Sequence, residues 1–134
     1  MNKWLAALAA ALCIVACTKS STSSSTTPTS TKTTDTFSGT VAVKGTDVHS
    51  FTVNSSGQVD VTLTAANPAV TMGLSIGVPN GSACPAIAGG SVVANAGSTA
   101  QLSGILSPAT YCVAAFDIGS QSQPVSYTVT VAHF

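Results

Sequence analysis

The sequence predicts an all-β protein, a single antiparallel β-sandwich of jelly-roll-like type with about seven to eight strands. Two observations carry this prediction. Apolar and polar residues alternate in short segments, and turn-forming residues separate these segments. Charged residues make up only 6% of the chain, whereas helices draw on Glu, Lys, Arg, Gln and Leu. Abundant Ser, Thr, Gly, Ala and Val suit strands that are joined by small-residue turns.

The chain divides into three parts by composition. Residues 1–16 form an apolar leader, which is expected as the helix of a signal peptide. Residues 17–36 form a Ser/Thr-rich segment, and residues 37–134 contain all of the regular alternation. The third part has the size of one ordinary domain. We therefore expect one folded domain behind a cleaved leader and a linker.

The leader carries the signals of export and lipidation. Lys3 provides a positive charge, and residues 5–16 form an apolar stretch that is shorter than the ~20 residues of a membrane-spanning helix. The stretch ends in Ile14-Val15-Ala16-Cys17, which resembles a bacterial lipobox. This resemblance implies cleavage before Cys17 and acylation of its thiol and its new amino group. The expected location is the cell envelope, and in a diderm host Thr18 in place of a retention signal favours the outer membrane.

The segment behind Cys17 is expected to be a disordered linker. It consists of Ser and Thr, with Lys19, Pro28, Lys32 and Asp35 as the exceptions. Because it offers no apolar side chain to bury, nothing offsets the entropy cost of ordering it. It would hold the domain at a distance from a membrane.

Four strands are expected in the first half of the domain. Each contains apolar residues at every second position, and each is followed by a Gly, Asn or Pro signal for a turn. The four segments span residues 37–43, 49–53, 59–63 and 72–78.

In the second half of the domain, the alternation predicts three further strands, over residues 101–106, 111–116 and 125–131. The segment 111–116 is apolar on both faces, so we expect it to be central or to be covered by the loop that carries Cys84. The stretch 83–98 shows weaker alternation. Within it, Val92 and Val93 fit either a short strand or a long loop.

The order of these segments resembles the bacterial pre-peptidase C-terminal domain. Such domains are small extracellular jelly-roll sandwiches, often appended to secreted peptidases, and the resemblance spans residues 37–134. This chain has His49 where the family has an aromatic residue. Related collagen-binding domains use acidic residues to bind calcium, but this chain has no Glu and only scattered Asp, so we expect neither calcium binding nor collagen binding. The segments that carry the resemblance are Phe37-x-Gly39-x-Val41, Asp47-x-His49-x-Phe51-x-Val53, Gly57-x-Val59-x-Val61-x-Leu63, Leu74-x-Ile76, Ser107-Pro108-Ala109-Thr110-Tyr111-Cys112-Val113 and Tyr127-x-Val129-x-Val131.

The cysteines predict one disulfide. Of the four cysteines, Cys13 lies in the leader and Cys17 would carry lipid, which leaves Cys84 and Cys112. An exported chain meets an oxidising compartment, so these two are expected to pair. A reactive thiol or a metal site is the alternative, but no Cys-x-x-Cys spacing supports it.

The few charged residues and the two histidines argue against nucleic acid and metal ions as partners. Four basic and four acidic residues, all Lys or Asp, balance to a net charge of zero. Only Lys44 lies within the expected domain, so nucleic-acid binding is not predicted. Neither His49, His133 nor the scattered Asp residues show ligand spacing, so we predict no metal and no cofactor. His133 stands next to the last residue and is expected to fray.

One motif matches an enzyme signature in letters only. Gly73-Leu74-Ser75-Ile76-Gly77 reads G-x-S-x-G, but a nucleophile elbow needs a strand, a strained turn and a helix. Here Ser75 lies inside an alternating strand, and Pro79 prevents a following helix. Asp47 and His49 could complete a Ser-His-Asp set, yet a turn Asp and a half-buried His explain them more simply. We therefore predict no enzyme activity.

The predicted function is that of a non-catalytic, lipid-anchored envelope protein. It would serve as a binding or display module for an extracellular glycan or protein. Phe116 and His49 are the candidate ligand contacts, because Tyr111 and Tyr127 fall on apolar faces and are expected in the core. Three alternatives remain: a purely structural envelope lipoprotein, a small hydrolase, and an enzyme inhibitor presented from the loop 79–98.

Overall fold

The computed structural model describes residues 30–134. The predicted leader, the lipidation site Cys17 and the first part of the predicted linker lie outside these residues. The described residues form eight strands and no helix, which confirms the all-β prediction. The strands are β1 Thr33–Val41, β2 Thr46–Val53, β3 Gly57–Asn67, β4 Met72–Gly77, β5 Ala86–Ala94, β6 Leu102–Leu106, β7 Ala109–Phe116 and β8 Val125–His133.

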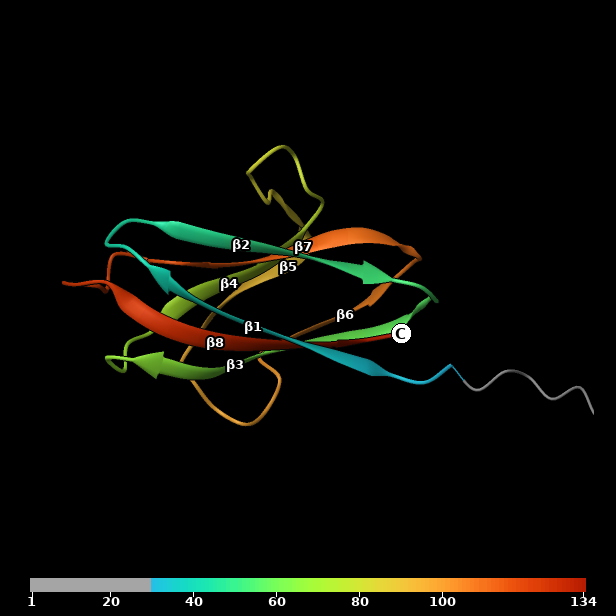
Figure 1. Cartoon of the computed structure of the whole chain (residues 1–134), viewed down its shortest axis with the longest axis horizontal. Coiled ribbons are helices and arrows are strands. Elements are labelled where there is room, and N and C mark those ends of the chain that lie inside the picture. The colour runs from blue at the N-terminus through green and yellow to red at the C-terminus, as the bar shows by residue number, and fades with distance from the viewer. Residues whose placement is uncertain (1–29) are drawn as a thin grey trace, which may run out of the picture.

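The strands form two antiparallel sheets that face each other (Figure 1). One sheet has the order β1-β8-β3-β6 and the other the order β2-β7-β4-β5. Strand β1 pairs with β8, β2 with β7, β3 with β6 and β4 with β5, which is the nested pairing of a jelly roll. The edge strands β1 and β2 approach each other along one side of the sandwich, and β5 and β6 along the other.

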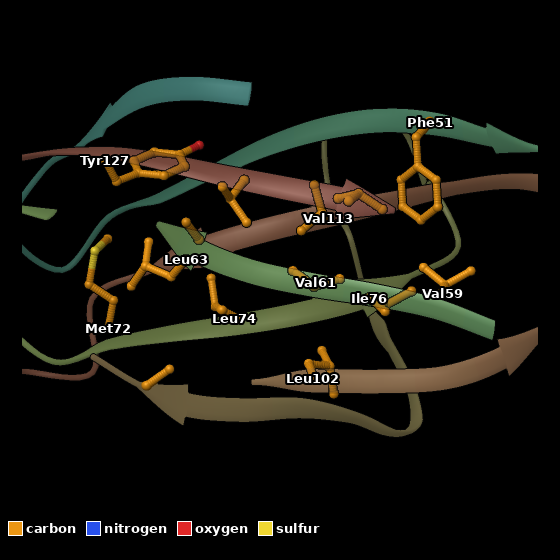
Figure 2. Close-up of a cluster of buried hydrophobic side chains, with 14 of the residues drawn as sticks. Phe51, Val59, Val61, Leu63, Met72, Leu74, Ile76, Leu102, Val113 and Tyr127 are labelled. Atoms are coloured by element: carbon orange, nitrogen blue, oxygen red, sulfur yellow. The ribbon is translucent and has the colours of Figure 1, made fainter. Parts of the chain in front are cut away.

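The core lies between the two sheets and is built from alternate residues of each strand (Figure 2). In β3 the inward residues are fully buried while their neighbours are partly or fully exposed, so the period-two pattern read from the sequence is the burial pattern of the strand. Every residue of β4 is buried. The largest side chains with almost no solvent exposure are Leu63, Met72, Leu74, Val41, Val53, Val59, Val61, Val113, Val125, Val129 and Val131.

Strand β1 begins earlier than predicted. Residues 33–36, which composition assigned to the linker, pair with residues 130–133 of β8. Backbone pairing needs no apolar side chain, and Thr is well suited to strands. For this reason a segment that reads as linker by composition can still be an edge strand.

The structure adds detail at two other places, the turn after β1 and the stretch 83–98. The first turn centres on residues 42–45 with Lys44 in the left-handed region (φ 59), so Val43 is 41% exposed instead of facing the core. Val92 and Val93 lie in β5, which settles the open choice in favour of a strand. Gly89 and Gly90 had hidden this strand, because they interrupt the alternation.

A polar network fixes the chain where it enters β1. Asp60 on the outer face of β3 accepts hydrogen bonds from Ser103 Oγ (2.6 Å) and Gln58 Nε2 (2.7 Å), and it forms an ion pair with Lys32. These contacts lower the pKa of Asp60 to about 2, and the contact with Lys32 has the largest effect. Lys32 also lies over the ring of Phe134, 5.6 Å from its centroid. The residue before β1 is thus tied to the sheet at the end where the chain terminates.

Asp60→Asn should change the acid stability of the fold. The pKa of Asp60 is lower in the folded state than in the unfolded chain, so its contribution is complete above about pH 4 and is lost as pH falls through about 2. Because the network is largely exposed, we expect the variant to lose less than about 1 kcal/mol at pH 7. Urea unfolding at pH 7, 4 and 2 measures this loss, which should be complete at pH 7 and much smaller at pH 2. An equal difference from the parent at all three pH values would contradict the assignment.

Candidate functional site

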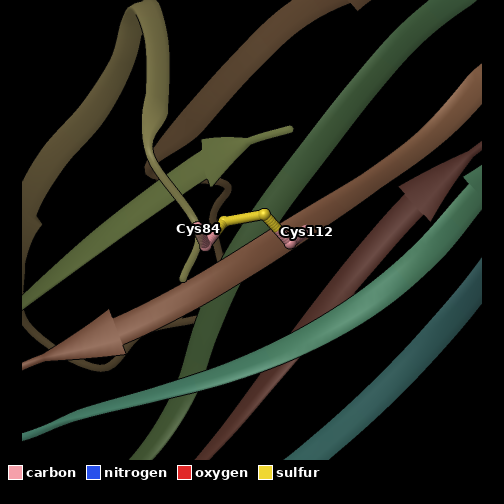
Figure 3. The surroundings of a disulfide bond; sticks show 2 residues. All are labelled: Cys84 and Cys112. Atoms are coloured by element: carbon pink, nitrogen blue, oxygen red, sulfur yellow. A yellow bond between two sulfur atoms is a disulfide. The ribbon is translucent and has the colours of Figure 1, made fainter. Parts of the chain in front are cut away.

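Cys84 and Cys112 form a disulfide, as predicted from their number and the expected compartment (Figure 3). Their Cα atoms are 5.9 Å apart and they are separated by 28 positions along the chain. Cys112 lies in the central strand β7, and Cys84 lies in the loop 78–85 between β4 and β5. A cross-link over this span stabilises the fold by about 3–4 kcal/mol on the chain-entropy model. Its local consequence is that the loop is held against the outer face of the sheet.

The pinned loop and strand β2 border a groove of about 460 Å³. A tight turn shapes the loop: Asn80 and Ala83 exchange two backbone hydrogen bonds of 3.0 Å, and Gly81 has a φ of 60°. At its end the loop packs on Gly77, where a Cβ atom would come within 2.1 Å of the Pro85 carbonyl oxygen. The groove contains no charged side chain, since its lining residues are Thr46, Val48, Asn80, Ser82, Ala83, Cys84 and Pro85.

Phe116 lies on the same face of the sheet as this groove. It is the β7 partner of Thr46, which lines the groove. Its ring lies directly over Gly73 of β4, where a Cβ atom would be 2.1 Å from Phe116 Cε2. The ring is therefore packed down on the neighbouring strand and only partly exposed. It is not among the residues that line the groove, and it does not stand up from the sheet as a platform.

The G-x-S-x-G segment is a plain strand. Ser75 lies in the middle of β4, is 5% exposed and pairs with Ala114 on one side and Ser91 on the other. Glycine and serine at alternate positions keep the outer face of β4 flat, and Phe116 and the pinned loop pack on it. The strained turn and helix of a nucleophile elbow are not formed at this position.

The other candidate contact, His49, points to the opposite side of the sheet. In the register of β2 and β7 it pairs with Val113, whose side chain is in the core, whereas Ser75 pairs with Ala114 on the outer face. The structure brings His49 within 3.5 Å of Asp47, as their spacing suggested. It does not bring Ser75 to them, so the three residues do not form a Ser-His-Asp set.

His49 and Asp47 share a partner that the sequence analysis assigned only to the core. Tyr127 of β8 donates its hydroxyl proton to Asp47 Oδ2 at 3.0 Å, and His49 Nε2 lies 2.9 Å from the same hydroxyl oxygen. Because that proton is directed at the carboxylate, the oxygen must accept from His49, which places a proton on Nε2. The pKa of the Tyr127 hydroxyl is raised far above its ordinary value, mainly by burial and secondly by the hydrogen bond to Asp47.

Strand β1 completes this arrangement, which we name the tyrosine clamp (Asp47, His49, Tyr127, Phe37 and Gly39). The ring of Phe37 stacks on His49 with centroids 4.9 Å apart and planes 12° from parallel. Gly39 leaves room for Asp47, since a Cβ atom there would lie 2.0 Å from Oδ2. The clamp joins β2 of one sheet to β1 and β8 of the other, so it closes the side of the sandwich where β1 and β2 meet.

The expectation for His133 was wrong. It lies inside β8 and is 4% exposed, because β1 extends far enough to cover it. Its Nε2 atom is 3.0 Å from Asp35 Oδ2, and its ring centroid is 5.4 Å from that of Phe51. A second His–Asp pair therefore holds the same side of the sandwich at the end where the chain enters.

Asp117 organises the loop between β7 and β8. Its carboxylate accepts backbone N–H groups from Lys44, Gly119, Ser120 and Gln121 over 2.8–3.2 Å, which lowers its pKa. The hydrogen bond from the Lys44 backbone N–H lowers this pKa most. Asp117 thus joins the β1–β2 turn to the loop before β8.

Neither a metal site nor a membrane helix is found in residues 30–134. No group of three or more His, Cys, Asp or Glu side chains in this range is placed to hold a metal ion. No helix there is long and apolar enough to cross a membrane. Comparison with protein-family models finds no match, and comparison with curated proteins finds no similar sequence. The resemblance to the pre-peptidase C-terminal domain therefore stays a prediction.

Tyr127→Phe should destabilise the fold by about 1–3 kcal/mol. The change removes one oxygen and leaves both Asp47 and His49 without their partner in a half-buried site. Tyr111→Phe is the matched control, because its exposed hydroxyl donates only to the Ser107 carbonyl oxygen at 3.1 Å; its cost should stay below about 1 kcal/mol. Urea unfolding of both variants measures the difference. Equal costs would refute a special contribution of the clamp.

Proposed function

We propose that this chain is a lipid-anchored, non-catalytic module of a bacterial cell envelope that binds a neutral extracellular ligand. The observation that carries the proposal is the groove between β2 and the loop 78–85. Its volume lies within the range of ligand pockets, roughly 300–1,000 Å³. The disulfide fixes one wall and a β-strand forms the other, so the groove is largely preformed. Preformed walls reduce the entropy cost of binding.

The lining favours a neutral glycan as the ligand. Asn80, Thr46 and Ser82 can both donate and accept hydrogen bonds, which matches the hydroxyl groups of a sugar. Val48 and Pro85 add apolar contact. A charged ligand would find no opposite charge among the lining residues and would lose hydration on entry. Among the partners expected from the sequence, a glycan fits these groups better than a charged protein surface does.

The anchor of the proposed module is Cys17 with its acyl chains. The lipobox resemblance supports this, and each buried methylene would contribute about 0.8 kcal/mol to membrane binding. Lys32, held on Asp60, fixes the point at which the folded domain leaves its linker. The eight-stranded sandwich also fits the resemblance to the pre-peptidase C-terminal domain, which is a small extracellular module. The hydrolase alternative loses its support, since Ser75 and His49 lie on opposite faces of the sheet.

Thr46→Trp should block the groove. A large ring at this exposed position of β2 fills the space beside the loop, and aromatic residues are well accepted in strands. Thr52→Trp is the matched control, because it lies on the same face of the same strand but outside the lining. On an array of neutral oligosaccharides, the parent and Thr52→Trp should bind alike, and Thr46→Trp should bind at least about tenfold more weakly.

Two results would count against the proposal. If Thr46→Trp and Thr52→Trp bind alike, the groove is not the site. If the parent binds no neutral oligosaccharide, the glycan proposal fails, and the purely structural role of an envelope lipoprotein gains support.

Cys17→Ala tests the anchor. The variant should lose all labelling by a palmitate analogue and should leave the membrane fraction, because the thiol that carries the lipid is gone. Cys13→Ala is the control and should be labelled like the parent, because Cys13 lies in the leader that is removed. Labelling of Cys17→Ala at the parental level would disprove the anchor.

A further inference from the structure

The two open sides of the sandwich differ. On one side the tyrosine clamp joins the edge strands β1 and β2. On the other side, where β5 and β6 lie across from each other, a slot of about 200 Å³ enters between the two sheets. Ile76, Ile87, Leu102 and Leu106 form its apolar walls. The slot is distinct from the groove beside β2, which lies on the outer face of one sheet.

Glycine residues keep this slot open. Gly104 is the middle residue of β6, and Leu102 and Leu106, two positions away on each side, are buried in the core. A side chain at position 104 would therefore point between the sheets, and a Cβ atom there would meet nothing within 4 Å. Gly89 of β5 also has open space around its Cβ position. The slot is the space that a side chain at position 104 would occupy.

The edge of β6 is also unprotected by charge. Natural edge strands usually carry charged residues, Pro or bulges that prevent pairing with other chains. Neither β5 nor β6 contains a charged residue. Strand β5 is irregular at its edge, with Gly89 at a φ of 70° and a register shift opposite β4. Strand β6 keeps a regular register with β3 over its whole length, and its Ile105 is 75% exposed.

We propose that the edge of β6 binds an extended, uncharged polypeptide segment with a central aliphatic residue. Its backbone would pair with the free N–H and C=O groups of β6, and its aliphatic side chain would enter the slot beside Gly104. An unpaired edge is satisfied by another backbone, which a glycan or a helix does not supply. The neutral lining selects against charged side chains, since a charge buried there would have no partner.

A second copy of this chain does not fill the slot. If β6 paired with β6 of another molecule about a two-fold axis at the slot, each strand would present Gly104 to the other, with no side chain to insert. The neighbouring Leu102 and Leu106 are already buried in their own core. A different segment with a side chain at the central position is therefore the better occupant. This site goes beyond the proposed glycan groove and does not depend on it.

Isoleucine methyl NMR can test the site on the full-length chain in detergent micelles. Ile76 and Ile87 line the slot, Ile105 lies on the outer face of the β6 edge, and Ile118 lies in the loop after β7 as an internal control. The probe is the peptide acetyl-Thr-Ser-Ile-Ser-Thr-amide. We expect saturable shifts of the Ile76 and Ile87 methyl groups in the slot, a smaller shift at Ile105 on the edge, and none at Ile118. The same peptide with Asp in place of Ile should cause no shifts.

Gly104→Val supplies the decisive variant. A valine here fills the slot from within, suits a strand, and has open space, so the variant should fold. It should weaken peptide binding at least tenfold, and Gly104→Ala should weaken it less. Thr46→Trp should bind the peptide like the parent, which separates this site from the glycan groove.

The proposal is overturned if the peptide leaves the slot methyl groups unshifted at millimolar concentration, or if Gly104→Val binds it like the parent. It is also overturned if sedimentation shows a dimer that Gly104→Val abolishes, because the occupant would then be a second copy.

Discussion

The central position of β7 determines how both faces of its sheet are built. Flanked by β2 and β4, this strand is buried on both sides. Its inward residues Val113 and Ala115 belong to the core, and its outward residues Cys112 and Ala114 are equally inaccessible to solvent. The outward side is covered because Cys112 is bonded to the loop between β4 and β5. Core and groove therefore depend on the same strand, one on each face.

The residues around β7 are small for a physical reason. A disulfide loop and the ring of Phe116 can approach the outer face only where the neighbouring strand has little side chain. Gly73 and Gly77 provide this room, with Phe116 over the first and Pro85 over the second. The same alternation that resembles an enzyme motif in letters is therefore a packing surface. Its chemistry is steric, and the groove beside β2 results from the loop that packs on it.

The strand pattern was predictable, because each strand of the core buries one face and the alternation is visible in the sequence. Predictions were wrong where backbone pairing holds a segment in place, and the choice between strand and loop stayed open where glycine interrupts the alternation. The first residues of β1 have no apolar side chain, and they hold their place through β8. Strand β5 runs without a break from Ala86 to Ala94, but Gly89 and Gly90 interrupt the alternation in its sequence. The fraying expected for His133 ignored that an extended β1 would cover it.

The candidate sites were predictable to different degrees. The disulfide followed from the count of cysteines and the expected compartment, without knowledge of the fold. The tyrosine clamp joins residues 78 positions apart, and no local pattern links them. What the sequence does contain is a spacing of two between Asp47 and His49. Which residue lies opposite this pair depends on the β1–β8 and β2–β7 registers, and those are properties of the whole sandwich.

The two sides of the sandwich show how a chain with few charges closes its edges. On the β1–β2 side, two of the four Asp residues and both His residues form hydrogen bonds between strands, although Nδ1 of the buried His133 has no partner. On the β5–β6 side there is no comparable polar closure, and glycine replaces the side chains that would fill the space. A sandwich that needed both sides only for stability would gain by placing an aliphatic residue at position 104, since the space is open and strand propensity would rise. Glycine at position 104 is therefore the feature that leaves this side of the sandwich open, whereas side-chain hydrogen bonds close the other.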